Sequence, residues 1–173
     1  LDTDSFLLVT KPPYGVGREI FRICLYDNCL DDLTAPLEIP IGPPGISPDR
    51  HFAIAFSEID LTALVLFNLL QRQSYEVFHV QFDYINYSPL VWSDNGQEVY
   101  ALGANYNRLN TEVGIYKLTF EGQTLIAQQQ LVEIDDDLAY STALWLVDPV
   151  NQLSIHALRN GGLNIVCWDI TSA

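Results

Sequence analysis

Carboxylates are the most numerous chemically active side chains in the sequence, and three of them, Asp135, Asp136 and Asp137, stand in a row. Carboxylate oxygens are the ligands that Ca²⁺ prefers in proteins, but this run has neither the ligand spacing nor the glycine of an EF-hand loop. We therefore expect exposed turn aspartates, no metal site and no cofactor. The three residues are the candidates if a surface cation binds.

The sequence predicts no catalytic residue. It contains no G-x-S-x-G, no H-E-x-x-H and no P-loop. Its histidines, His51, His79 and His156, lie in short apolar runs, where we expect hydrogen-bonded strand residues. A triad would need a nucleophile and a carboxylate around one of them, and no local signature indicates this arrangement. We therefore expect that the chain itself is not an enzyme.

Aromatic residues and one arginine are the better candidates for binding. Tyr84, Tyr87, Tyr106 and Arg108 lie in two segments that we read as connections between strands. Binding residues concentrate on such connections, and Tyr and Arg are enriched at protein interfaces. Loop aromatics can also simply cap a sheet. We take these four residues as candidates for ligand or partner binding.

Charge and hydropathy exclude several kinds of partner. The chain has 8 Lys and Arg residues against 22 Asp and Glu residues, for a formal net charge of −14. A nucleic-acid-binding protein needs basic patches against phosphate, so we expect no nucleic acid and no anionic membrane as partner. The longest apolar stretches, such as 63–70, are far shorter than the ~20 residues of a membrane span. Cationic partners are favoured.

The three cysteines do not form a fully paired framework. Cys24 and Cys29 are five residues apart and Cys167 stands alone, without zinc-site spacing. A bridge between Cys24 and Cys29 across a turn would fit an oxidising compartment. Two reduced, partly buried thiols are the alternative, and they are our expectation.

Length and composition indicate a folded chain. It has 173 residues, of which 49% are hydrophobic and 17% are charged, and this excludes intrinsic disorder. A chain of this length can bury a core as one domain. It contains no methionine and begins with Leu1, so we expect a processed or truncated piece of a larger protein.

Short apolar runs recur along the chain, and the elements they form would position the candidate binding residues. Polar turns, each followed directly by an apolar run, begin at residues 2, 47, 93 and 148. The runs are rich in Val, Ile, Phe and Tyr and are bounded by Gly, Pro, Asn and Asp, which indicates β-strands. The second run of each repeat is predicted as a strand at residues 19–26, 63–70, 114–120 and 163–170. The third run is predicted as a strand at residues 35–41, 75–82 and 127–134. Residues 114–120 alternate, with Ile115 on one face and Tyr116 on the other.

Two of these segments carry a resemblance to known repeats. Pro44-Gly-Ile-Ser-Pro-Asp49 with His51-Phe-Ala-Ile-Ala-Phe56 resembles the "SPDG…IAF" segment of TolB-like and WD40-like β-propeller blades, of the PD40 type. Pro89-Leu-Val-Trp-Ser-Asp-Asn-Gly96 resembles the "PxWSPDG" form. Arg50 and the pair Asn95-Gly96 depart from the consensus turn. The resemblance implies an all-β fold, a partial β-propeller of about four blade equivalents built from four-stranded antiparallel meanders. We expect one domain over residues 1–173, incomplete at both ends, with repeats at 1–42, 43–88, 89–138 and 139–173.

The resemblance implies a function only by analogy. We expect a non-catalytic binding or scaffolding module, a protein–protein interaction region of a larger protein. One alternative is a propeller that gates a separate hydrolase (peptidase) domain, and another is a propeller that binds a sugar, a small ligand or Ca²⁺. We expect the partner to be a protein or the remaining blades, with association into a homo-oligomer, and the TolB-like resemblance favours an extracytoplasmic location.

Overall fold

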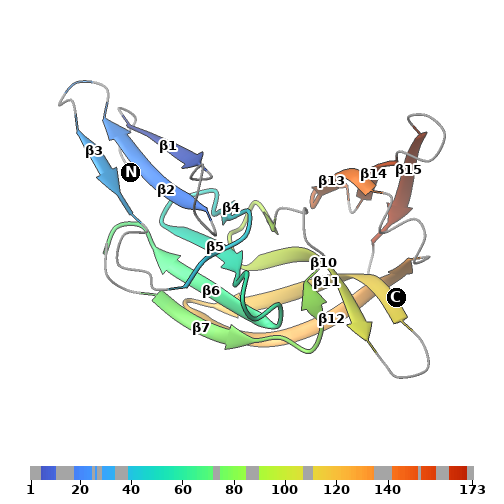
Figure 1. The fold of residues 1–173 in the computed structure, drawn as a ribbon. Coiled ribbons are helices and arrows are strands. Elements are labelled where there is room, and N and C mark those ends of the chain that lie inside the picture. Colours follow the sequence, from blue (N-terminus) through green and yellow to red (C-terminus); the bar gives the residue numbers. More distant parts are fainter. Residues whose placement is uncertain are drawn as a thin grey trace.

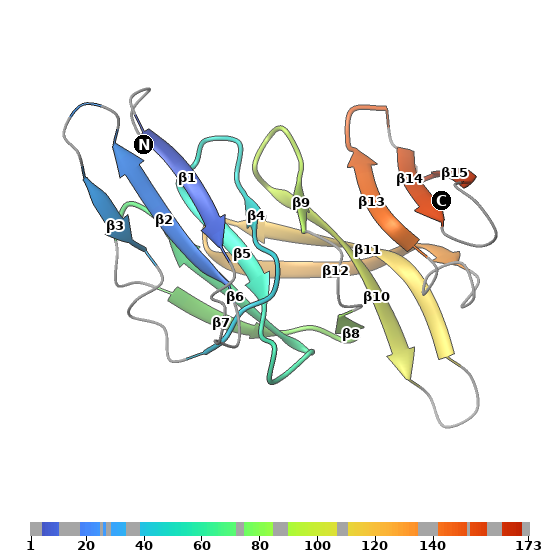
Figure 2. The ribbon, with the colours of Figure 1, turned by 45° about the horizontal axis from the view of Figure 1, so that its top comes forward.

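The computed structural model describes residues 5–10, 18–24, 26, 29–33, 39–71, 75–84, 90–106, 111–134, 142–151, 153–158 and 164–170. Within these ranges the chain forms fifteen β-strands and no helix, so the predicted all-β class is confirmed. No helix able to cross a membrane therefore occurs in the described part of the chain. Figures 1 and 2 show the strands in four separate sheets, with the first sheet and the fourth at opposite ends of the row.

Each sheet is antiparallel and is built almost entirely from consecutive strands. The first contains β1 (Ser5–Thr10), β2 (Glu19–Cys24) and β3 (Leu30–Asp32). The second contains β4 (Gly45–Ile46), β5 (Phe52–Phe56), β6 (Ala63–Asn68) and β7 (Tyr75–His79). The third contains β8 (Asp83–Tyr84), β9 (Val91–Trp92), β10 (Glu98–Tyr106), β11 (Thr111–Glu121) and β12 (Thr124–Ile134). The fourth contains β13 (Thr142–Asp148), β14 (Leu153–Leu158) and β15 (Asn164–Asp169).

The core lies between neighbouring sheets and follows from the two-residue period of the strands. In β10, Val99 and Ala101 pack toward the second sheet, whereas Tyr100 and Leu102 belong to the cluster next to the fourth. The alternation predicted for residues 114–120 is confirmed, since Tyr116 and Ile115 join opposite clusters. Because β5 and β6 are covered on both faces, they read as nearly continuous apolar runs.

The first sheet corrects two predictions. The third strand was expected at 35–41, but β3 is Leu30–Asp32 and pairs with β2 through Ile23↔Leu30. The thiols of Cys24 and Cys29 were expected to be reduced, but they form a disulfide with a Cα–Cα distance of 5.0 Å. The next step in this register places Cys24 opposite Cys29, whose carbonyl accepts the Cys24 N–H at 3.1 Å. The bridge closes a short hairpin, so the third strand begins immediately after it.

Tyr116 carries a buried hydroxyl that has no hydrogen-bond partner. Its ring stacks on Phe82 with centroids 4.0 Å apart, and only 5% of the residue is exposed. Burial, and then the negative charges of Glu112 and Glu133, raise the pKa of Tyr116 above its ordinary value of 10.0. A buried polar group without a partner destabilises a fold by about 1–3 kcal/mol.

We therefore expect Tyr116→Phe to raise the free energy of unfolding by about 1 kcal/mol, because it removes only this hydroxyl. The matched control is Tyr100→Phe, because the Tyr100 hydroxyl donates to Glu98 Oε2 at 3.3 Å, and this variant should not be stabilised. Urea denaturation of both variants measures the difference. A raised folded-state pKa also means that the contribution of Tyr116 is complete below pH 10 and is lost as the pH rises through the folded value. Alkaline pH should accordingly destabilise the wild type more than Tyr116→Phe.

Candidate functional site

Most residues predicted to bind lie outside what the structure describes. Tyr87 and Arg108 are outside the described residues, and so are Asp135, Asp136 and Asp137. Tyr84 and Tyr106 were placed in connections, but their backbones belong to β8 and β10. The hairpin of β10 and β11 extends to the pair Tyr106↔Thr111, which turns the predicted loop into strand. The side chains of Tyr84 and Tyr106 are not among those described, so their role stays a prediction.

A polar turn that repeats between strands is the local structure from which a different site is built. In the second sheet the turn joins β4 to β5. Ser47 Oγ donates to Asp49 Oδ1 at 2.6 Å and accepts the Phe52 N–H at 2.9 Å, and Asp49 Oδ1 accepts the His51 N–H at 3.0 Å. A serine and an aspartate thus satisfy the backbone donors of a tight turn, the role for which these residues are favoured.

The turn between β9 and β10 repeats this network 46 residues later. Ser93 Oγ donates to Asn95 Oδ1 at 2.6 Å and accepts the Glu98 N–H at 3.0 Å. Asn95 Oδ1 accepts the Gln97 N–H at 2.9 Å. Asn95 therefore occupies the position that Asp49 has in the other turn, with the same hydrogen bonds and without the charge. In the fourth sheet, Asp148 Oδ1 caps the corresponding turn by accepting the Asn151 N–H at 3.0 Å.

The two turns differ at the residue that takes a left-handed backbone conformation. Arg50 has φ 59°, and Gly96, 46 residues further on, has φ 68°. A left-handed conformation costs a residue with a Cβ about 1–2 kcal/mol, a cost that glycine does not carry. With Arg50 in place of the consensus glycine, the turn between β4 and β5 has the same shape as the turn between β9 and β10, but its backbone is strained.

We expect Arg50→Gly to stabilise the protein by about 0.5–1 kcal/mol, since the relief of strain exceeds the extra entropy of glycine in the unfolded chain. Arg50→Ala is the control, because it removes the side chain but keeps the Cβ, and it should give no comparable gain. Thermal and urea unfolding of the two variants are compared. Equal stabilisation by both substitutions would mean that the gain comes from removing the Arg50 charge and not from relief of backbone strain.

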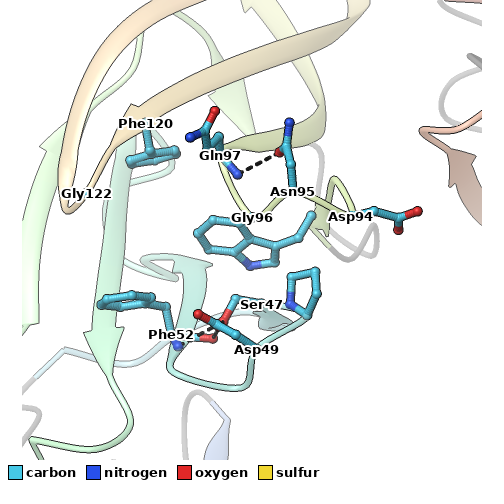
Figure 3. A pocket seen from close by; sticks show the side chains of 11 residues that line it. Ser47, Asp49, Phe52, Asp94, Asn95, Gly96, Gln97, Phe120 and Gly122 are labelled. Atoms are coloured by element: carbon cyan, nitrogen blue, oxygen red, sulfur yellow. Dashed lines mark hydrogen bonds between the residues drawn. The ribbon is translucent and has the colours of Figure 1, made fainter.

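A pocket of about 240 Å³ lies between these two turns, where the second and third sheets meet. Its base is aromatic, with Trp92 and Phe120 largely buried and Phe52 partly exposed. In Figure 3 the rings of Phe52 and Phe120 lie on the same side of the pocket, Gln97 and Asn95 lie on one turn, and Ser47 and Asp49 lie on the other. The lining residues are Ser47, Pro48, Asp49, Phe52, Trp92, Asp94, Asn95, Gly96, Gln97, Phe120 and Gly122.

The inner strands of the two sheets hold the pocket in place. β4 and β9 lie side by side, and Trp92 Nε1 donates to the carbonyl oxygen of Gly45 at 3.1 Å. Trp92 is 8% exposed and belongs to the core. Its indole N–H is thus used between the sheets, and only its ring contributes to the pocket.

The carboxylate of Asp49 at the pocket is ionised under ordinary conditions. Partial burial raises the pKa of Asp49, but the hydrogen bonds from Ser47 and from the His51 backbone, with the His51 ring, outweigh it, and the net shift is downward. Asp94 lies at the rim, exposed to solvent, and Figure 3 shows its carboxylate directed away from the rings of Phe52 and Phe120. The pocket therefore combines aromatic surface with negative charge.

Ser47, Asp49 and His51 lie together but do not form a catalytic triad. The serine hydroxyl donates to Asp49, and His51 Nδ1 lies 3.1 Å from the other oxygen of the same carboxylate. In a triad the histidine stands between the nucleophile and the acid, whereas here the acid stands between the other two. His79 lies 3.8 Å from Asp60 on the surface, and the side chain of His156 is not described. No group of three or more metal-ligating side chains occurs among the described residues.

Comparisons with known proteins bear on the fold. No family model and no curated protein matches the sequence. TolB from Acinetobacter baumannii is similar in structure, with a TM-score of 0.60 at 13% identity over 96% of this chain and 38% of its own. A chain of the nidogen/laminin complex gives 0.58 at 11% identity over 88% and 52%. Oligogalacturonate lyase from Vibrio parahaemolyticus gives 0.61 at 11% identity over 90% and 43%. The chain thus spans about half or less of each of these structures.

These likenesses confirm the predicted partial β-propeller. Each sheet is one blade, and the pocket lies between the turns of two neighbouring blades. The fold is shared with TolB at low identity, and the finer resemblance to PD40-type or WD40-like repeats stays a prediction. The pocket was not foreseen from the sequence. The repeated Ser-x-Asp and Ser-x-Asn of the two turns was the signal that could have pointed to it.

Proposed function

We propose that this chain is a non-catalytic binding module, a protein-interaction region within a larger protein. The pocket between the two turns is the observation that carries this proposal, because partly exposed aromatic surface beside the ionised carboxylate of Asp49 suits recognition of another molecule. The serine that lines it is held by Asp49 and by the backbone of Phe52, so its hydroxyl serves the turn. This arrangement supports a role in binding rather than in bond breaking.

Two observations support a protein as the partner. One structure of similar fold is a complex, that of nidogen and laminin. In addition, the outer face of the first sheet carries Leu8 (44% exposed), Leu30 (67% exposed), Phe21 and Ile23. The corresponding residues of the second sheet, such as Ala55 and Val65, are fully buried between blades. An apolar surface of this kind is typical of a face that another protein surface covers.

A further blade of the same architecture is the occupant that this face fits. In both sheets the residues of this face are apolar cross-strand pairs, Leu8 opposite Phe21 in the first and Ala55 opposite Val65 in the second. Size-exclusion chromatography with light scattering tests association of the isolated chain, which should be larger than one copy. Leu8→Asp should reduce it to a monomer, whereas a monomeric wild type would oppose self-association.

The disulfide between Cys24 and Cys29 supports an extracytoplasmic location, because such bonds persist in oxidising compartments. Alkylation of the natively expressed protein followed by mass spectrometry measures it. Both cysteines should be protected from the reagent until a reductant is added, and free thiols at both positions would contradict the assignment.

The decisive experiment measures binding and chemistry together, because the lyase shows that the same fold also serves enzymes. The purified chain is used to isolate its partner from native extract, and the partner is then purified and titrated by calorimetry. We expect a fixed stoichiometry and an unchanged partner mass after prolonged incubation. Conversion of the partner with turnover would overturn the proposal of a non-catalytic module.

A further inference from the structure

We propose that the pocket between the two turns receives a positively charged side chain, arginine or lysine, of the partner protein. This inference deepens the proposed function and rests on it, since it names the group that the module recognises. It follows from the charge of the lining, from the aromatic surface and from the comparison of the two turns.

The charge at the pocket is negative. Asp49 contributes a carboxylate, Asp94 adds a second one at the rim that is directed away from the rings, and no Lys, Arg or His is among the described residues that line the pocket. A chain with a formal net charge of −14 adds to this local field and attracts cations at longer range. A neutral or anionic ligand would gain nothing from these charges, whereas an ammonium or a guanidinium group would.

The aromatic surface suits the same group. A cation is attracted to the face of an aromatic ring within about 6 Å of its centre. Trp92 and Phe120 form the base, with ring centroids 6.0 Å apart, and Phe52 stands partly exposed beside them. Asp49 and Phe52 both line the pocket, so a cation bound there would have a carboxylate and an aromatic ring among its neighbours. The apolar stem of an arginine or a lysine would cover the remaining ring surface.

The two turns provide matched positions for testing the charge. Asp49 and Asn95 accept the same pair of hydrogen bonds through Oδ1, from a serine hydroxyl and from a backbone N–H. Asp49→Asn therefore removes a charge while the turn keeps its acceptor. Asn95→Asp adds a charge at the equivalent position on the other side of the pocket. The two substitutions should change affinity in opposite directions, and both keep the Oδ1 acceptor of the turn.

His51 is a built-in competitor for the carboxylate. Its Nδ1 lies 3.1 Å from the second oxygen of Asp49, with both side chains about half exposed. The titration is therefore made at one fixed pH for all variants.

The probe is the peptide acetyl-Gly-Arg-Gly-amide, and its control is the same peptide with citrulline, which has nearly the same shape and no charge. Binding is followed by the NMR signal of the Trp92 indole N–H, assigned with Trp92→Phe. We expect saturable shifts with the arginine peptide and none with citrulline. Asp49→Asn should weaken binding about threefold and Asn95→Asp should strengthen it about threefold, the size usual for one exposed ion pair. Phe52→Leu should weaken it about twofold through loss of the ring.

Glu133→Gln is the matched control for net charge, since Glu133 is exposed and lies eleven residues along β12 from the Gly122 turn, about 35 Å away. Its affinity should equal that of the wild type. Equal shifts with both peptides, unchanged affinity in both charge variants, or a response to a neutral oligosaccharide alone would overturn the inference. If the purified partner binds Asp49→Asn and wild type equally, the proposed function stands and the inference fails. If no partner protein binds but the arginine peptide does, the pocket recognises a cationic side chain and the proposed function fails.

Discussion

Gly45→Ala is expected to lower the free energy of unfolding by about 3 kcal/mol. A Cβ at this position would overlap the carbonyl oxygen of Leu90 and would lie 2.8 Å from its carbonyl carbon. These are backbone atoms of the neighbouring blade, which cannot move aside as a side-chain end can. Overpacking of this kind costs about 1–3 kcal/mol, and more when no atom can yield.

The same substitution disturbs the hydrogen bond that joins the two blades. The carbonyl of Gly45 accepts the Trp92 indole N–H at 3.1 Å, so moving β4 away from β9 leaves a buried donor without a partner. An unsatisfied buried donor adds about 1–3 kcal/mol. Both costs arise at the inner strands, which hold the second and third blades together.

Gly122→Ala separates this mechanism from a general cost of replacing glycine. Gly122 has φ 61° and nothing within 4 Å of the added Cβ, so its only penalty is backbone strain of about 1–2 kcal/mol. Urea denaturation of the two variants should rank Gly45→Ala as clearly less stable. If the two costs are equal, the contact between β4 and β9 does not hold the blades together in solution.

The elements that could be predicted from the sequence are those set by local periodicity. The alternation of residues 114–120 and the Asn95-Gly96 turn specify a strand and a hairpin through neighbours in the chain. The register of the first hairpin was not available locally, because whether Cys24 meets Cys29 depends on a shift of one residue in pairing. For the same reason the third strand was placed too late.

Features that arise from stacking or from unpaired edges could not be read from the sequence. The pocket joins residues 46 positions apart, such as Asp49 and Asn95, and only the packing of one blade on the next brings them together. The short strand β8 was also unforeseen. β9 pairs with only two residues of β10, and β8 takes up Gly103 and Ala104 further along the same edge. An edge left open by one strand is a property of the sheet, and it has no local signature.

Phe82→Ala is expected to have a larger effect than Gly45→Ala, about 3–5 kcal/mol of lost stability. The ring is 2% exposed, stacks on Tyr116 with centroids 4.0 Å apart and meets Phe56 edge-on at 6.0 Å. Its removal opens a cavity between the second and third blades and strips Tyr116 of its stacking partner. The loss of stability should exceed that of Gly45→Ala if the Phe82 ring fills the space between the second and third blades as closely as the structure indicates.

Gly103 explains why the ring can lie so close to the third sheet. A Cβ at Gly103 would overlap Cδ2 of Phe82 and would lie 2.7 Å from Cε2. Gly103→Ala alone should therefore cost about 1–3 kcal/mol by overpacking. In the double variant the added methyl group enters the space that the ring has left. The two costs should then sum to more than the cost of the double variant, with a favourable coupling of about 1–2 kcal/mol.

Phe82→Ala combined with Gly122→Ala is the control cycle, because Gly122 has no neighbour within 4 Å of its added Cβ and shares none with Phe82. Those two costs should add within about 0.5 kcal/mol. Urea denaturation of the wild type and the five variants gives both cycles from one experiment. Strict additivity of Phe82→Ala and Gly103→Ala would mean that the ring and the glycine do not share one space. The close packing of β10 against the second blade would then need another cause.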